Sequence, residues 1–374
     1  DLTNPEVIGY IKKVIRTAVN EWGYRYLKLD FLYAGALAGK RWDPGITRAQ
    51  ALRAGLQAIR EAAGEATFLA GCGSPLGPAI GLVDSMRIGP DVAPRWRPAY
   101  QGIEFYFHRE PSLPSLRNAI QNTLIRAPLH RRWWINDPDC FLFRDSDTHL
   151  SEDEVKLFTT VGALSGGSML LSDDLLNLSE ERQSWATKVL PPLKSGLLVP
   201  DQFDRLRPEQ LVLPLSGAVG DWVLLACINW SDRARRIQLD PSRLPYISRG
   251  MMGVDFWQQI PVFLKGVKWE LTVPGHGIRL LQLRQASDHK PIWLGDTLHI
   301  SGGRIVTGWN VGDDSLAADI QLGRRGSGKI WLKLPQAPKR ASFRGESIDY
   351  QLRNSGVYRF DLSGIRGGDL VVHW

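Results

Sequence analysis

Apolar residues recur at helical spacing through the first half of the chain, and short apolar runs separate these stretches. The clearest case follows Asn4 and Pro5, a cap and a first-turn residue, where apolar side chains return every three or four positions until Gly23. The pattern predicts helices at residues 4–22, 46–63, 115–125, 151–164 and 179–189, and strands at residues 24–34, 67–72, 82–88, 133–136 and 168–171. Such alternation is typical of a parallel sheet with crossover helices.

Beyond Pro191 and Pro192 the pattern changes to short alternating runs with turn residues between them, which predicts antiparallel β structure. Strands are expected at residues 211–215, 222–229, 236–239, 269–273 and 278–283, and, after a linker at 286–291, at residues 298–300, 304–310, 317–322, 330–334, 356–362 and 369–374. We therefore expect an α/β region at residues 1–195, an antiparallel β domain at 196–285 and a second small β domain at 286–374.

Two architectures fit the α/β region. A closed (β/α)8 barrel needs eight strands, so the predicted strands would be about the last five of a TIM-type barrel, with about three units before Asp1. A doubly wound open sheet needs no further strands, and periodicity alone favours neither. Since the chain opens without an initiator Met or a signal peptide, we interpret it as a fragment or a processed product, and the localisation stays open. An incomplete barrel wall should expose apolar surface and unpaired strand edges.

The composition of the chain argues against several classes of function. The net charge is +7, from 46 Lys and Arg against 39 Asp and Glu, but the basic residues form no long stripe with interleaved aromatics, so nucleic-acid binding is not expected. No apolar run is long enough to span a membrane. Three distant cysteines and seven histidines show neither a disulfide framework nor a metal-ligand spacing, so no metal site and no cofactor are expected.

Polar residues lie at the predicted carboxyl ends of the strands, where active residues lie in both architectures. Lys28 and Asp30 stand two apart in the first strand, so both side chains leave the same face. We expect that face to be buried, and burial of an unpaired ammonium or carboxylate is unfavourable. The pair is therefore either an internal ion pair or a catalytic carboxylate with a cationic companion.

The later strand ends add small and acidic residues. They are the segment 71–74, Arg87 with Asp91 across a Gly-Pro bend, the segment 136–139, and the segment 172–174. Each acid alone could be a helix cap or a solvated loop residue, but together they outline an acidic pocket. Glycoside hydrolysis requires two carboxylates facing each other across such a pocket. Mg²⁺ is a weaker alternative, because Lys28 and Arg87 would compete with the cation.

Three tryptophans lie close to these strand ends in the sequence, Trp96, Trp133 and Trp134. Their rings could stack on the faces of sugars, and the alternative is packing in the core.

Four motifs occur in order: Tyr-Leu-Lys28-Leu-Asp30, Gly-Cys72-Gly-Ser-Pro-Leu-Gly, Asp-Ser-Met-Arg87-Ile-Gly-Pro-Asp91 and Trp-Ile-Asn-Asp-Pro-Asp139-Cys. Together they resemble the α-galactosidases of glycoside hydrolase family 36 and, more distantly, those of family 27. The resemblance covers roughly residues 1–195 and, loosely, the β domain that follows. It implies the carboxyl-terminal portion of such an enzyme, that is, a partial (β/α)8 barrel followed by antiparallel β domains.

The resemblance also implies roles for single residues. Asp30 takes the position of the nucleophile, and Asp91 that of the general acid and base. Lys28 and Arg87 would bind sugar hydroxyls and hold the two acids in place, while Cys72 and, by the weaker family 27 match, Asp139 would contact the sugar. For a retaining mechanism, the carboxyl groups of Asp30 and Asp91 should stand about 5–5.5 Å apart.

The implied activity is retaining hydrolysis of terminal α-galactosides by double displacement. The alternatives are a galactosyl-transferring relative, an α-N-acetylgalactosaminidase, or a non-catalytic carbohydrate-binding fragment. The expected partner is an α-galactoside oligosaccharide, and the sequence leaves open whether the chain forms a homo-oligomer.

Overall fold

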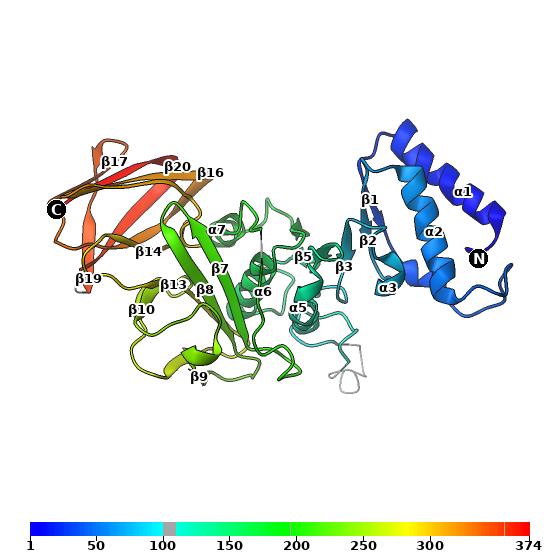
Figure 1. Cartoon of the computed structure of the whole chain (residues 1–374), viewed down its shortest axis with the longest axis horizontal. Coiled ribbons are helices and arrows are strands. Elements are labelled where there is room, and N and C mark those ends of the chain that lie inside the picture. Colours follow the sequence, from blue (N-terminus) through cyan, green and yellow to red (C-terminus); the bar gives the residue numbers. More distant parts are fainter. Residues whose placement is uncertain (100–109, 195, 355) are drawn as a thin grey trace.

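The computed structural model describes residues 1–99, 110–194, 196–354 and 356–374. The molecule is elongated, with the first helices at one end and the last β strands at the other (Figure 1). The helices are α1 (Pro5–Arg16) with its π-helical continuation η1 (Thr17–Glu21), η2 (Leu32–Ala36), α2 (Arg48–Ala63), α3 (Leu76–Ala79), α5 (Leu116–Ile125), η3 (Ala127–Leu129), α6 (Glu152–Ser165), α7 (Glu180–Lys188) and η4 (Pro241–Arg243). Within the described ranges, none of these helices combines the length and apolarity needed to cross a membrane.

The predicted helix starts are confirmed, because side chains cap them as the sequence indicates. The Asn4 side chain accepts a hydrogen bond from the Glu6 N–H, which fixes the first turn of α1. At α6, the Ser151 side chain accepts from the Glu154 N–H and the Glu154 carboxylate accepts from the Ser151 N–H. This reciprocal capping box satisfies two N–H groups that the helix itself leaves free.

Four parallel strands form the first sheet, in the order β1-β2-β3-β4. They are β1 (Tyr26–Leu29), β2 (Phe68–Gly71), β3 (Ser85–Arg87) and β4 (Ile135–Asp137). The helices α1 and α2 lie side by side next to this sheet, and their apolar faces share a buried core with its strands (Figure 1). The helices and strands predicted between residues 4 and 136 are therefore all present, in the predicted order.

The predicted fifth strand needs correction. It is β6 (Leu170–Leu171), which pairs with β5 (Cys140–Phe141) in a separate two-stranded parallel sheet. A hydrogen bond of 2.8 Å from the Ser168 N–H to the Asn136 carbonyl connects the approach to β6 with β4. The segment 138–139 turns sharply before β5, with Asp139 at a φ of 83°, and this bend interrupts the wall. Within the described residues the parallel strands close no barrel.

The burial predicted for the first strand is wrong. β1 is an edge strand, and Tyr26 and Lys28 on it are exposed. The chain leaves the strand at Phe31, whose φ of 54° is left-handed, and η2 follows at once. Because β1 pairs with a strand on one side only among the described residues, its side chains lack the cover that a central strand receives. The exposed rings of Tyr24 and Phe31 confirm the expected apolar surface at this edge.

Antiparallel sheets occupy the rest of the chain, as predicted. The first has the order β11-β10-β13-β8-β7, beside the pair β12-β9, and the last has the order β14-β16-β20-β17-β18 with β15 on β16 and β19 on β20. Their strands are β7 (Gln210–Gly217), β8 (Gly220–Ile228), β9 (Arg235–Leu239), β10 (Met251–Asp255), β11 (Ile260–Phe263), β12 (Trp269–Val273), β13 (Ile278–Gln285), β14 (Ile292–Asp296), β15 (Val306–Val311), β16 (Ser315–Lys333), β17 (Arg340–Phe343), β18 (Glu346–Ser347), β19 (Tyr350–Asn354) and β20 (Val357–His373). The strand predicted at 298–300 is wrong, since these residues form turns after β14.

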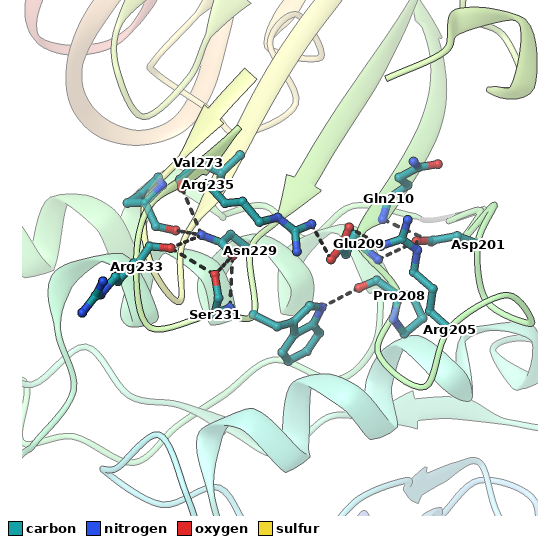
Figure 2. A network of polar contacts seen from close by, with 12 residues as sticks. Asp201, Arg205, Pro208, Glu209, Gln210, Asn229, Ser231, Arg233, Arg235 and Val273 are labelled. Atoms are coloured by element: carbon teal, nitrogen blue, oxygen red, sulfur yellow. Dashed lines mark hydrogen bonds and ion pairs between the residues drawn. The ribbon is translucent and has the colours of Figure 1, made fainter. Parts of the chain in front are cut away.

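One core spans the helical and the β parts. It gathers buried residues of α5, α6 and α7 together with those of β7, β8 and β13. The chain enters β7 through a polar network in which buried Glu209 accepts from Arg205 and, at 2.8 Å, from Arg235 on β9 (Figure 2). Asp201 accepts from the N–H groups of Glu209 and Gln210. This network fixes the start of β7 against β9, while the domain boundaries at 195 and 285 stay a prediction.

Candidate active site

Asp30 follows the end of β1 by one residue, and its carboxylate faces a cation, a thiol and a backbone amide. The Lys28 Nζ lies 3.8 Å from Asp30 Oδ2, and the two side chains are 45% and 43% exposed. The Phe31 N–H donates to Asp30 Oδ1 at 2.7 Å. A hydrogen bond with the Cys72 thiol is the main cause that lowers the pKa of Asp30. Burial opposes the shift, and Phe31 N–H, Lys28 and Arg87 reinforce it. Asp30 is therefore an accessible carboxylate held in its ionised form.

Cys72 stands at the end of β2, next to Asp30 on the neighbouring strand. Its N–H donates to the Leu29 carbonyl at 2.8 Å, which continues the β1–β2 pairing up to the site. Burial first, and the hydrogen bond to Asp30 second, raise the pKa of the Cys72 thiol to about 11. The group is thus a neutral thiol that donates to Asp30. Gly73 follows with a φ of 58°, a left-handed conformation that glycine adopts without strain.

Arg87, the last residue of β3, is 5% exposed and is bound by three carboxylates. Its Nη2 lies 2.7 Å from Asp139 Oδ1, its Nη1 3.0 Å from Asp91 Oδ1, and its Nε 3.5 Å from Asp137 Oδ2. Burial would lower the pKa of Arg87, but the charges of Asp137 and Asp139 outweigh it and raise that pKa. Asp137 and Asp139 are buried with the guanidinium, whereas the Asp91 side chain is 75% exposed. The two buried carboxylates therefore neutralise most of the positive charge of Arg87. The Asp91 side chain extends from the guanidinium toward solvent.

Asp139 binds protein groups with both of its oxygens. Oδ1 accepts from Arg87 and, at 2.7 Å, from the Cys140 N–H, while Oδ2 accepts from the Val92 N–H at 2.7 Å. Val92 follows Asp91 directly, so Asp139 ties the segment that carries Asp91 to the end of β4. This environment favours a positioning role for Asp139 over the sugar contact expected from the sequence.

Asp137 belongs to the segment 136–139 of the predicted acidic pocket, but the sequence analysis assigned it no role of its own. Its Oδ1 accepts from the Asp139 N–H at 2.9 Å, and its other oxygen faces Arg87. The signal was present in the sequence, because Asp137 ends a strand and stands two residues before Asp139. Its register opposite Arg87 on β3 is a feature of strand pairing that the sequence did not reveal.

A cavity of about 550 Å³ opens beside this cluster. It is lined by Tyr33, Gly73, Ser74, Pro75, Leu76, Arg87, Ile88, Gly89, Pro90, Pro111, Ser112, Asn122 and Arg126. Arg126 donates to the Ile88 carbonyl and to the Asn122 side chain, which fixes the start of the bend before Asp91. The cavity thus begins where the segment 88–91 leaves β3.

The tryptophans proposed for sugar stacking do not line the described wall of this cavity. Trp96 is buried in the core of the helical and β parts, where it stacks on His276. Trp134 is buried in the core of the first sheet, and half-exposed Trp133 packs edge-on against it. Core packing, the alternative given above, holds for Trp96 and Trp134.

The structure brings Lys28, Asp30, Cys72, Arg87, Asp91 and Asp139 to one edge of the first sheet, as the strand-end argument predicts. The separation of the Asp30 and Asp91 carboxyl groups stays a prediction. Across the described part of the chain, no group of three or more His, Cys, Asp or Glu residues is arranged to hold a metal ion.

No protein family model matches the chain. Among solved structures, the α-galactosidase of Thermus thermophilus in complex with p-nitrophenyl α-D-galactopyranoside is 34% identical, covering 57% of this chain and 40% of that one, with a TM-score of 0.45. α-Galactosidase I of Mortierella vinacea is 18% identical, covering 74% of this chain and 72% of that one, with a TM-score of 0.54. An α-galactosidase of Saccharomyces cerevisiae with raffinose is 14% identical, covering 74% and 76%, with a TM-score of 0.55.

The chain spans 40% of the length of the Thermus protein. Its likeness to the fungal and yeast structures concerns the fold, which is that of TIM-barrel glycosidases with β-sheet domains. The two parallel sheets of this chain are similar to part of that architecture, and a partial barrel stays a prediction.

Proposed function

We propose that this chain carries the catalytic carboxylates of a retaining α-galactosidase. The observation that carries the proposal is the arrangement at the ends of β1 and β3, where exposed Asp30 and Asp91 flank the cations Lys28 and Arg87. Two carboxylates with access to one substrate are what a double displacement needs. The fold shared with α-galactosidases agrees with this chemistry. The family resemblance of the four motifs quoted above implies the same roles for these residues.

In the first step, an Asp30 oxygen attacks the anomeric carbon of the α-galactoside while Asp91 gives its proton to the departing glycosidic oxygen. The glycosidic bond breaks as a β-linked galactosyl ester forms on Asp30. In the second step, Asp91 removes a proton from water, and the resulting oxygen nucleophile displaces Asp30. Galactose leaves with its α configuration retained, and Asp91 is protonated again.

The surroundings of the two acids suit these different tasks. The thiol of Cys72, the Phe31 N–H and the nearby cations favour ionised Asp30, the form that a nucleophile requires. Asp91 shares Arg87 with two buried acids, so the attraction of this cation is divided among three carboxylates. The Asp91 segment is anchored by Asp139 and Arg126, which limits the positions that its carboxyl group can take.

A second candidate is carbohydrate binding without turnover. The side chains of Asp30 and Asp91 are 43% and 75% exposed, whereas catalytic electrostatics is strongest in a site that excludes water. Hydrolysis by this chain would therefore require that bound substrate or further protein segments cover the two acids. Transfer of galactose, action on α-N-acetylgalactosaminides, and membership of family 36 rather than family 27 stay predictions.

The proposal is tested with p-nitrophenyl α-D-galactopyranoside, with release of nitrophenol followed by absorbance and the first-formed sugar anomer by NMR. We expect α-galactose as the first product. Asp30→Ala should lose at least about 10³-fold in kcat/KM, as expected for loss of a nucleophile. Asp313→Asn, which removes an exposed carboxylate in the turn before β16, is the matched control and should leave kcat/KM unchanged.

β-Galactose as the first product would refute retention. Saturable binding of the galactoside without turnover would favour the non-catalytic alternative. Equal activity of Asp30→Ala and the unaltered chain would show that Asp30 is not the nucleophile.

A further inference from the structure

A second cavity, of about 500 Å³, lies in the antiparallel part of the molecule. It is lined by Pro214, Leu215, Ser216, Asp221, Trp222, Val223, Tyr246, Ser248, Met251 and Gln285. These residues belong to β7, β8, β10 and β13, or stand beside them, and Figure 1 shows these strands apart from the sheet that carries Asp30 and Arg87. The cavity is therefore a site of its own, and its volume falls in the range of small-molecule pockets.

Trp222 gives this cavity a rigid aromatic component. The side chain is buried, and its indole N–H donates to the Ser301 carbonyl at 2.7 Å. The Arg284 guanidinium lies 4.9 Å from the ring centroid and donates in turn to the Leu294 and Gly302 carbonyls. A ring held by these contacts on the sheet is preorganised for a ligand.

Tyr246 is the unusual member of the lining. Its backbone is left-handed, with a φ of 62°, a conformation that is a genuine outlier for a bulky side chain. Tyr246 is nevertheless 66% exposed, so packing of its ring against other side chains does not account for this backbone conformation. Strained positions persist where the surrounding structure imposes them, and they concentrate at binding sites. Its hydroxyl has no hydrogen-bond partner among the described residues.

The polar groups of the lining are also available for a ligand. Within the described part of the chain, neither the Asp221 carboxylate nor the Ser216 hydroxyl has a hydrogen bond or an ion pair through its side chain. Ser248 donates to the Gln285 Oε1 at 2.9 Å, which leaves the Gln285 amide NH₂ as a donor. The cavity thus offers an acceptor carboxylate, an amide donor and hydroxyl groups around aromatic and aliphatic surface.

This chemistry selects one class of ligand. The described lining contains no Lys or Arg, so it offers no counter-charge for a phosphate or another anion. A single carboxylate without further acidic ligands does not make a cation cage. A molecule with several hydroxyl groups and one apolar face matches both the polar groups and the exposed ring, and a neutral sugar has these features.

We propose that the cavity bounded by Tyr246, Asp221 and Gln285 is a second carbohydrate-binding site, which takes a neutral oligosaccharide of two or three units. The ring of Tyr246 covers the apolar face of one sugar, and Asp221 and Gln285 hydrogen-bond its neighbouring hydroxyls. The site goes beyond the proposed function and does not depend on it, because no residue of the Asp30 cluster lines it. Its effect would be to hold a glycan near the enzyme independently of hydrolysis.

Binding is measured by saturation-transfer NMR and calorimetry on the full chain, with raffinose, maltotriose and cellotriose as probes. The key variant is Tyr246→Asn, because asparagine tolerates a left-handed backbone, so the ring is removed while folding is maintained or improved. We expect the association constant of at least one probe to fall tenfold or more in this variant. Phe203→Ala removes a 93% exposed ring outside the cavity and should leave binding unchanged.

Three further variants separate the possible causes of binding. Asp30→Ala should retain this binding, so failure of the proposed hydrolysis would not affect the result. Asp221→Asn keeps hydrogen-bonding groups, so it should weaken sugar binding less than Asp221→Ala does. Absence of binding by all three probes, or equal binding by the unaltered chain and Tyr246→Asn, would overturn the proposal. A site that binds an organic ammonium ion such as choline but no sugar would overturn it as well.

Discussion

Replacing Arg87 with Met should destabilise the candidate active site locally. The guanidinium is 5% exposed, and the carboxylates of Asp137 and Asp139 beside it are 6% and 9% exposed. Without Arg87, two negative charges remain buried side by side with no cation between them. Loss of one partner of a buried ion pair costs about 3–5 kcal/mol. Asp91 contributes little to this effect, because it is 75% exposed and exposed pairs contribute only about 0–1 kcal/mol.

Hydrogen exchange followed by mass spectrometry is the appropriate assay, because it reports local opening without assuming two-state unfolding of the whole chain. The amide of Ile88 is a direct reporter, since it donates to the Asp137 carbonyl at 3.1 Å. At 1.4 kcal/mol for each tenfold change, a cost of about 3–5 kcal/mol means that Arg87→Met should accelerate exchange in peptides that cover β3 and β4 by about 10²- to 4 × 10³-fold.

Asp91→Asn serves as the comparison, and it should change the exchange of the same peptides by less than about tenfold. Adding Asp139→Asn to Arg87→Met should restore part of the protection, because one of the two unpaired charges is then removed. The account of Arg87 is refuted if Arg87→Met exchanges like the unaltered chain, or if Asp91→Asn exchanges as fast as Arg87→Met.

Three further predictions concern single groups. Burial and the hydrogen bond to Asp30 raise the pKa of Cys72 to about 11, so alkylation of Cys72 by iodoacetamide should stay slow at pH 8. Asp30→Asn should accelerate this alkylation, and peptide mass spectrometry measures the rate in both proteins. Burial raises the pKa of Asp296 to about 7. The folded chain therefore holds a proton that the unfolded chain releases, so stability should fall as the pH rises from about 4 through 7, and Asp296→Asn should flatten this dependence in thermal scans. Glu154 accepts from the Ser151 N–H and is hydrogen-bonded to His276, each at 2.8 Å, so Glu154→Ala should cost about 1–3 kcal/mol in urea unfolding, and Glu154→Gln less.

Local sequence signals predicted much of the helical framework. The Ser151–Glu154 capping box lies where the pattern placed it, because capping depends on residues only three apart. The strands β10 and β11 were missed. All five residues of β10 are buried, so its two faces show no alternation of polar and apolar side chains.

The long strand β16 was predicted as two strands, because glycines such as Gly323 and Gly326 interrupt its apolar pattern. The chain nevertheless stays paired with β20 through register shifts between Gln321 and Gly328. Pairing with a partner strand therefore determines the extent of β16 more than its own pattern does.

At the candidate site, the strand-end argument brought the chosen residues to one edge of the sheet, but it did not predict their burial. The expectation of a buried Lys28 and Asp30 failed because β1 is an edge strand, which depends on the order of strands in the sheet. The contact between Asp137 and Arg87 was missed for a similar reason, since the position of Asp137 opposite Arg87 follows from the register of β3 and β4. Strand order and register arise from contacts between distant segments, which a single sequence does not display.

The central claim is the assignment of Asp30 as nucleophile and Asp91 as acid and base, and the anomer of a galactosyl azide tests it most directly. Asp30→Ala and Asp91→Ala are each supplied with azide and p-nitrophenyl α-galactoside, and the product is assigned by NMR. In Asp30→Ala, azide attacks the substrate in a single inversion, so we predict the β-azide. In Asp91→Ala, azide displaces the β-linked ester on Asp30, so we predict the α-azide. The opposite pair of anomers would contradict the account by exchanging the two roles, and full turnover in both variants without azide would remove both residues from the mechanism.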